Sequence, residues 1–169
     1  MSVSKLKPYF EDDILDASFN KPQLDELYEV FKEHFVFDPF EIDGKRIKII
    51  HQKSRVKQYS EYSETFAHII SRKTYILDAR IYECQRANRI HWIRPVLQSH
   101  PCKDIFYYRW KDDEGVCKHH YWLFDKNFMV VTVDVKPDLR IVTTFCVDND
   151  QKSKFYERYK NFQEGEDCL

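Results

Sequence analysis

The feature that most constrains this fold is a series of four β-type segments in the C-terminal half of the chain. They cover residues 104–110, 117–124, 128–134 and 139–147. All four are rich in β-branched and aromatic residues, and short polar turns separate them. Short connections require neighbouring strands to pair antiparallel. The sequence therefore predicts a four-stranded antiparallel meander.

Two local signals precede the meander. Apolar residues recur at helical spacing over Asn20–Phe35, and Asn20 with Gln23 resembles a capping pair, so we expect an amphipathic helix. Asp43-Gly44 then lies between segments 36–42 and 45–51 and is the dipeptide that most favours a tight hairpin turn.

A second, central helix is predicted over residues 78–97, where Ile90, Ile93 and Leu97 form one apolar stripe. Pro95 should end or kink it, because proline lacks the backbone donor. We thus expect a single α+β domain over residues 1–169, with an N-terminal helix and small hairpin and a central helix packed on the meander. The charged residues 161–169 are expected to form a flexible tail.

Charge is distributed unevenly along the chain. Residues 9–43 hold 11 acidic residues against 2 basic ones, a balance of −9, and residues 45–111 hold 15 basic against 5 acidic, a balance of +10. A basic segment of this kind indicates an anionic partner, most commonly nucleic acid. The alternative is two solvated surfaces that neutralise each other, because sequence position does not show spatial clustering.

Several classes of protein are disfavoured. No apolar run approaches the roughly 18 residues of a membrane span, and the N-terminus lacks a signal-peptide core, so we expect a cytoplasmic protein with no membrane partner. Five cysteines without a CxxC pair predict free thiols. Cys117, His119 and His120 are close in sequence, but strand alternation splits them between the two faces of the sheet, and no second ligand pair is evident. No metal site is therefore predicted. Common nucleotide and hydrolase motifs are absent, and no cofactor is predicted.

Two arginines lie on or near the apolar stripe of the predicted central helix. Arg86 precedes Ile90 by four residues, and Arg89 precedes Ile93 by four. An arginine that faces a sheet needs an acceptor, because an unpaired buried charge is costly. The acceptor is either an acidic residue of this chain or a ligand phosphate held by the guanidinium fork. Alternatively, the arginine side chain extends along the edge of the apolar stripe and keeps its charged end in solvent.

A histidine stands out in the apolar stretch Phe66–Ile70. His68 lies inside this stretch, and Arg72 follows four residues later. Histidine suits proton transfer near neutral pH, and arginine suits a negatively charged substrate. The alternative is a hydrogen-bonded core histidine.

Polar residues also occur in the predicted strands. Alternation places Tyr121 and His119 on one face of their strand. It also requires either Thr143 or Thr144 to face the helices or a cleft.

The order of these segments resembles a known family. Phe66-Ala-His68-Ile-Ile70 is followed by Asp78-Ala-Arg80-Ile-Tyr-Glu83-Cys-Gln-Arg86-Ala-Asn-Arg89-Ile-His-Trp92-Ile93, and the meander ends in Ile141-Val-Thr-Thr-Phe-Cys-Val-Asp148. This pattern resembles the barnase-EndoU-colicin-RelE (BECR) superfamily of ribonucleases, especially its phage-associated branch. The resemblance covers about residues 45–160 and leaves the acidic arm, within residues 1–43, unaccounted for.

The resemblance implies a BECR-like nuclease core at 45–160 and a metal-independent endoribonuclease. Such an enzyme is a toxin-like, phage or mobile-element effector that cleaves RNA by attack of the ribose 2′-hydroxyl on phosphate. The chemistry needs a base, an acid and cations that stabilise the phosphorane. Catalysis is assigned to His68, Arg86, Tyr121 and Thr144, and substrate binding to Arg72, Lys73, Arg80 and Arg89. RNA, tRNA included, is the expected substrate, and an antitoxin or immunity protein is a further expected partner.

Two alternatives stay open. In the first, the fold is a non-catalytic nucleic-acid-binding or protein-binding module whose tyrosines and basic residues form a stacking and phosphate surface. In the second, the acidic arm is the functional part, either because it covers the basic face or because it docks on an immunity partner.

Overall fold

The meander strands lie where the sequence predicts them. The computed structural model describes residues 2–11, 19–76 and 79–168. In it the strands are β5 (Ile105–Lys111), β6 (Cys117–Leu123), β7 (Phe128–Val135) and β8 (Asp138–Cys146). Each pairs antiparallel with the next, and a bulge between Val131 and Thr132 shifts the register of β7 against β8.

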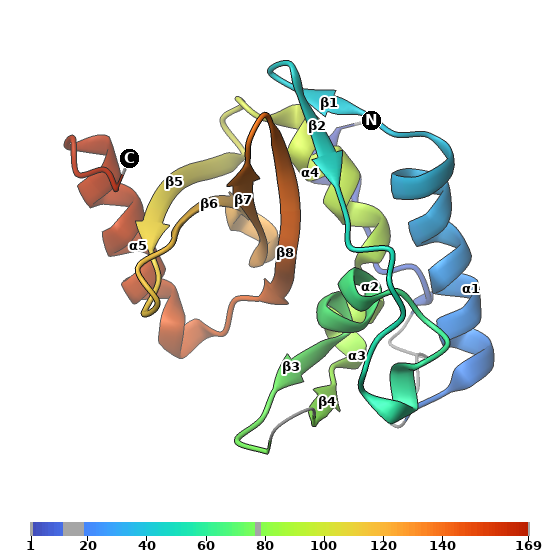
Figure 1. The fold of residues 1–169 in the computed structure, drawn as a ribbon. Helices are drawn as coiled ribbons and strands as arrows, with labels where there is room; N and C mark the ends of the chain where they lie inside the picture. Colours follow the sequence, from blue (N-terminus) through green and yellow to red (C-terminus); the bar gives the residue numbers. More distant parts are fainter. Residues whose placement is uncertain (1, 12–18, 77–78, 169) are drawn as a thin grey trace.

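The sheet has six strands rather than the predicted four. Asp43 and Gly44 adopt positive φ angles of 50° and 77° in the turn between β1 (Glu41–Ile42) and β2 (Lys45–Lys48). β2 pairs in parallel with β8, which gives the strand order β1-β2-β8-β7-β6-β5. The chain is therefore α+β as predicted, but the hairpin extends the meander into a curled, mixed sheet (Figure 1).

The N-terminal helix forms as predicted. α1 (Lys21–Lys32) begins after Asn20, whose side chain accepts a hydrogen bond of 3.2 Å from the backbone N–H of Gln23. A π-helical turn, η3 (Glu33–Phe37), continues it. The buried residues of α1 are Leu24, Leu27 and Phe31.

The prediction of one central helix over residues 78–97 is wrong. Instead the chain forms β3 (Ser71–Lys73), β4 (Arg80–Tyr82), α3 (Cys84–Ala87), the 3-10 turn η5 (Ile90–Trp92) and α4 (Ile93–Ser99). Residues 80–82 are extended because they pair with β3 in a separate two-stranded sheet. Pro95 is the third residue of α4, where a missing N–H breaks no intrahelical bond. Asp78 lies outside the described residues.

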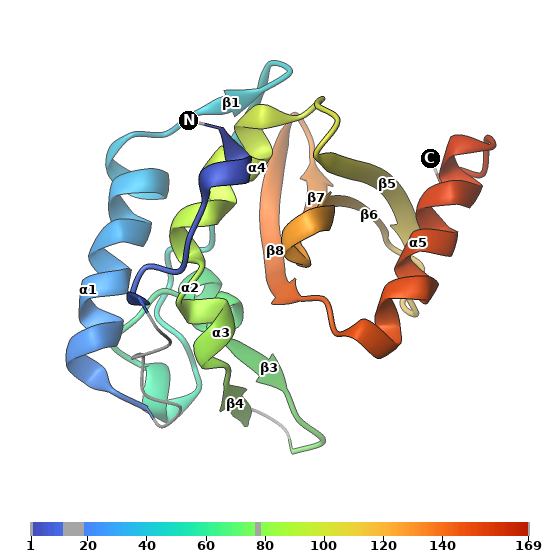
Figure 2. The ribbon, with the colours of Figure 1, turned by 180° about the vertical axis from the view of Figure 1, so that it is seen from behind.

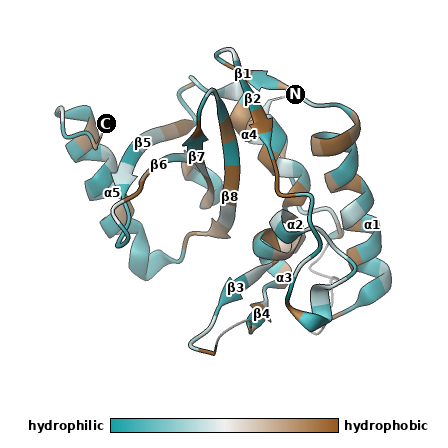
Figure 3. Cartoon of the chain, viewed as in Figure 1, coloured by the Kyte–Doolittle hydropathy of each residue, from teal (hydrophilic) through white to brown (hydrophobic). Residues whose placement is uncertain are grey.

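Helices cover both faces of the large sheet. α2 (Glu64–Ile69) and α3 pack on β8, α4 packs on β6 and β7, and α5 (Asn149–Gln163) packs along β5 (Figures 1 and 2). Among the described residues, short 3-10 turns also form at η1 (Val3–Lys5), η4 (Lys57–Tyr59) and η6 (Phe124–Lys126). β8, which α2 and α3 cover, carries a hydrophobic stretch, and α5 is mostly hydrophilic (Figure 3).

The C-terminal residues are attached to the sheet. Cys168 forms a disulfide with Cys117 at the start of β6, and Asp167 pairs with Arg109 of β5. The prediction that all five cysteines are free is wrong for this pair; the free cysteines are Cys84, Cys102 and Cys146. The segment expected to be a flexible tail thus has a covalent and an ionic link to the meander.

The N-terminal arm packs against the segment that follows β4. Asn88 exchanges hydrogen bonds with the backbone of Phe10, and the indole N–H of Trp92 donates to the carbonyl of Lys7. Residues 12–18 of the predicted acidic arm lie outside the described residues. In the described part of the chain, every helix is too short or too polar to cross a lipid bilayer.

Candidate active site

Helix α2 presents a carboxylate and an imidazole on one face. The Ser63 side chain accepts from the backbone N–H of Phe66 and caps the helix. The apolar side of α2 is buried, which leaves Glu64 and His68, four residues apart, on the outward face. Glu64 Oε1 lies 3.8 Å from His68 Nε2. The two groups are close enough for the carboxylate to stabilise a protonated imidazole.

The small β3/β4 sheet places two cations beside this pair. Lys73 and Arg80 are direct cross-strand partners, so their side chains lie on the same face of the hairpin. Like charges directly opposite each other destabilise a strand pair. An anion bound between them would relieve that repulsion.

A cluster of hydrogen bonds holds Arg80 in place. Its Nε donates to Ser71 Oγ at 2.7 Å, and its Nη2 donates to the carbonyl oxygen of Ser71 at 3.0 Å. Arg86, predicted on the apolar stripe, donates from Nη1 to the same carbonyl oxygen at 2.9 Å. Burial lowers the pKa of Arg80, and the charge of Arg86 lowers it further. Two guanidinium groups therefore converge on one backbone oxygen.

These elements line a cleft of about 530 Å³. Its lining side chains come from the loop before η4, from α2 and from the β3/β4 hairpin: Ser54, Arg55, Val56, Glu64, His68, Lys73, Thr74, Tyr75, Ile76, Ala79 and Arg80. Three of them are cationic, and Glu64 is the one acidic group among these residues. A cleft with this balance of charge attracts anions.

No protein-family model, curated protein or solved structure matches the chain.

His68 is held in its neutral form near pH 7. Burial lowers the pKa of its imidazole, and the positive charges of Arg80 and Lys73 act in the same direction, whereas Glu64 opposes them. The side chain is nevertheless 41% exposed, so solvent or a ligand reaches it. A neutral, accessible imidazole can accept a proton, and Glu64 is placed to stabilise the imidazolium that forms.

Not all predicted binding residues lie in this cleft. Arg72 alternates with Lys73 along β3 and pairs with Glu83 at 2.7 Å. Arg89 donates to the backbone and side chain of Gln85, and its guanidinium lies 5.1 Å from the centre of the Trp92 ring. Neither residue lines the cleft.

The two predicted strand residues lie apart from His68 as well. Thr144 is fully buried in β8, and its hydroxyl has no hydrogen-bond partner among the residues that the structure describes. Tyr121 lies on the sheet face that α4 covers and lines a second cavity, of about 240 Å³, with His100, His119 and Tyr107. The predicted residues are thus divided between two cavities and the core.

The second cavity contains a chain of polar contacts across four strands. Tyr107 Oη lies 2.6 Å from His119 Nδ1, and His119 Nε2 lies 3.1 Å from Asp134 Oδ2. Lys45 Nζ donates to the other oxygen of Asp134 at 3.1 Å. If His119 donates to the carboxylate, its Nδ1 accepts from the tyrosine hydroxyl. His119 and Tyr121 share a face, as strand alternation predicts, and this chain of contacts orients the buried imidazole.

Two charged residues of the cleft were missed by reasoning from the sequence. Glu64 carried a usable signal, because its spacing of four residues from His68 places both on one face of a helix. Arg55 carried no usable signal in the sequence, because it belongs to an irregular loop that only the tertiary fold brings to α2.

Proposed function

We propose that the chain is a metal-independent endoribonuclease whose reaction takes place in the cleft between α2 and the β3/β4 hairpin. The observation that carries the proposal is the convergence, in one anion-attracting cleft, of the Glu64–His68 pair with Arg55, Lys73 and Arg80. An acid–base group beside several cations is what cleavage of RNA by its own 2′-hydroxyl needs.

The reaction balances with these groups alone. Neutral His68 accepts the proton of the ribose 2′-hydroxyl, and the 2′-oxygen forms a bond to phosphorus. The bond from phosphorus to the 5′-oxygen breaks, and the imidazolium returns its proton to that oxygen. The products are a 2′,3′-cyclic phosphate and a 5′-hydroxyl. Arg80, held by Ser71, and Lys73 stabilise the charge on the phosphorane, and Glu64 stabilises the imidazolium.

The resemblance to BECR ribonucleases supports the same chemistry, and we propose membership of that superfamily on the sequence pattern. Of the residues assigned from it, His68, Lys73 and Arg80 line the cleft, and Arg86 contacts the same carbonyl as Arg80. RNA is then the partner, and tRNA is a natural first substrate to test.

The test is incubation of the purified protein with total RNA and with tRNA in excess EDTA, followed by analysis of the ends. We expect discrete products with cyclic phosphate ends, and a loss of about 10² to 10⁴ in rate for His68→Ala. His51→Ala is the matched control, because His51 is an exposed histidine outside the cleft. Intact RNA, or cleavage that His68→Ala leaves unchanged, would refute the proposal.

A second candidate function is a nucleic-acid-binding module without catalysis. One observation favours it: the guanidinium of Arg80 is held by Ser71 and by the carbonyl oxygen of His68, so the cationic face forms without any contribution from the His68 imidazole. Binding that weakens steeply with salt, is lost in Lys73→Met and is unchanged in His68→Ala, with the RNA intact, would support this function.

A further inference from the structure

A column of three aromatic rings ends at an open pocket on the α5 side of the sheet. The ring centre of Phe106 lies 4.4 Å from that of Phe124 and 4.5 Å from that of Tyr159, with planes inclined by 20° and 15°. Two rings cannot share one face of a third at these distances, so they flank Phe106 on opposite sides. The column links η6, β5 and α5, and Phe124 is the ring at the end that faces the pocket.

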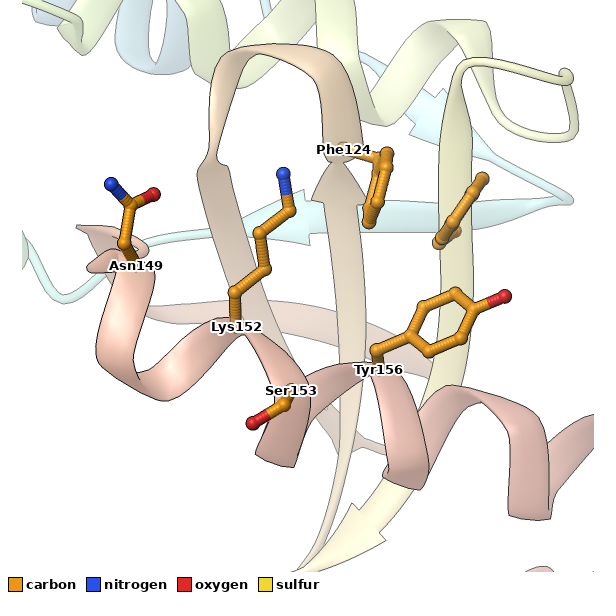
Figure 4. Close-up of a pocket in the computed structure, with 6 residues that line it drawn as sticks. Phe124, Asn149, Lys152, Ser153 and Tyr156 are labelled. Atoms are coloured by element: carbon orange, nitrogen blue, oxygen red, sulfur yellow. The ribbon is translucent and has the colours of Figure 1, made fainter.

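The outer face of Phe124 is covered by a lysine. Lys152 Nζ lies 4.2 Å from the ring centre. Figure 4 shows the Lys152 side chain extending from α5 toward the Phe124 ring. A cation–π contact at an accessible site contributes about 0.5–1 kcal/mol, and an ammonium on a flexible stem moves easily. Another flat π system can therefore replace Lys152 on this face at small cost.

The surrounding pocket has room and polar groups for such a ligand. Its volume is about 480 Å³, and its lining is Phe106, Phe124, Asn149, Lys152, Ser153 and Tyr156. The ring of Tyr156 is 6.0 Å from that of Phe124, and its side chain is exposed. Asn149, also exposed, supplies an amide with both donors and an acceptor on the Lys152 side of the pocket (Figure 4).

We propose that this pocket binds an unpaired base of single-stranded RNA, stacked on the outer face of Phe124. Lys152 then moves from the ring to the neighbouring phosphate, and Asn149 contacts the edge of the base. Every base has a π face, so the site tolerates any sequence. An apolar peptide side chain would also fit the ring, but it would leave Lys152 without an anion. This inference rests on RNA as the substrate and adds that the substrate is unpaired.

The test uses an RNA that the proposed reaction cannot cleave. Binding of 2′-O-methyl pentauridine and of an abasic analogue of equal length is measured for the wild type, Phe124→Leu and the control Phe37→Leu. Phe37 is an exposed phenylalanine of η3. We expect Phe124→Leu to weaken binding of the pentauridine by about 5- to 150-fold and to leave the abasic analogue unchanged. Lys152→Met should weaken both and reduce the slope of log Kd against log salt by about 0.7.

Each outcome of these binding measurements either supports or overturns the proposal. Equal losses for both oligonucleotides in Phe124→Leu, or no loss of pentauridine binding in that variant, would overturn base stacking. Binding to the wild type that occurs only with an aromatic peptide would overturn the RNA assignment. The wild type covers the case in which Phe124→Leu does not fold, because equal affinity of the wild type for the pentauridine and the abasic analogue would also overturn base stacking. If base-dependent binding holds but RNA stays intact in the cleavage assay, the endoribonuclease proposal fails and this inference stands.

Discussion

Replacing Cys168 by serine should strongly destabilise the folded chain. The Cys117–Cys168 disulfide closes a loop with a sequence separation of 51 residues. In the chain-entropy model, opening a loop of this length costs about 4 kcal/mol at 25 °C. The Arg109–Asp167 pair should weaken with it, but a partly exposed pair adds at most about 1 kcal/mol. For a domain of this size, a loss of 4 kcal/mol lowers Tm by about 8–16 °C.

The assay is urea unfolding with and without dithiothreitol. Reductant should lower the stability of the wild type to that of Cys168→Ser and should not affect the variant. Cys102→Ser is the control, because Cys102 is a free and partly buried cysteine. A wild type insensitive to reductant, or a loss under about 1 kcal/mol in Cys168→Ser, would refute the reasoning, since neither agrees with a bond that constrains the unfolded chain.

Three further predictions concern the core and the buried polar groups. Leu27→Ala in α1 should cost about 2–5 kcal/mol in urea unfolding because Leu27 is fully buried, whereas the exposed Glu29→Ala should be nearly neutral. Tyr107→Phe should cost about 1–3 kcal/mol because it leaves Nδ1 of the buried His119 without its partner; a cost below about 0.5 kcal/mol would contradict this. Burial lowers the pKa of His120 to about 4, below the ordinary value of about 6.5, so protonation favours the unfolded state. The contribution of neutral His120 to the free energy of unfolding should therefore be fully present above pH 6.5, and about 3 kcal/mol of it should be lost by pH 4. The free energy of unfolding is measured by urea unfolding across this pH range, and an equally steep fall in His120→Phe would contradict the assignment to His120.

Local signals predicted the elements that depend on neighbouring residues. The Asn20 cap, the Asp43-Gly44 turn and the four meander strands all formed as expected, because capping, turn geometry and strand alternation act within a few residues. The central helix failed for a tertiary reason. Residues 80–82 gain more by pairing with β3 than by continuing a helix, so only the later part of the helical pattern is helical.

The candidate site shows the same limit. His68 and Arg80 were proposed from the sequence and line one cleft, whereas Tyr121, which was proposed with them, lines a different cavity. Arg55 and Lys45 reach their cavities through loop and hairpin placement. The hydrophobic periodicity of the sequence does not show which loops and hairpins the tertiary fold brings together.

The parallel pairing of β2 with β8 affects the order of assembly during synthesis. β2 is made early, but its partner strand is near the end of the chain, and α2, which carries Glu64 and His68, packs on the same late strand. A ribosome-bound chain that lacks β8 can form the contacts of Phe66 with Tyr28 and Phe31 of α1, but α2 still lacks the strand on which it packs. The elements of the cleft therefore reach their final support only after residue 146 has emerged.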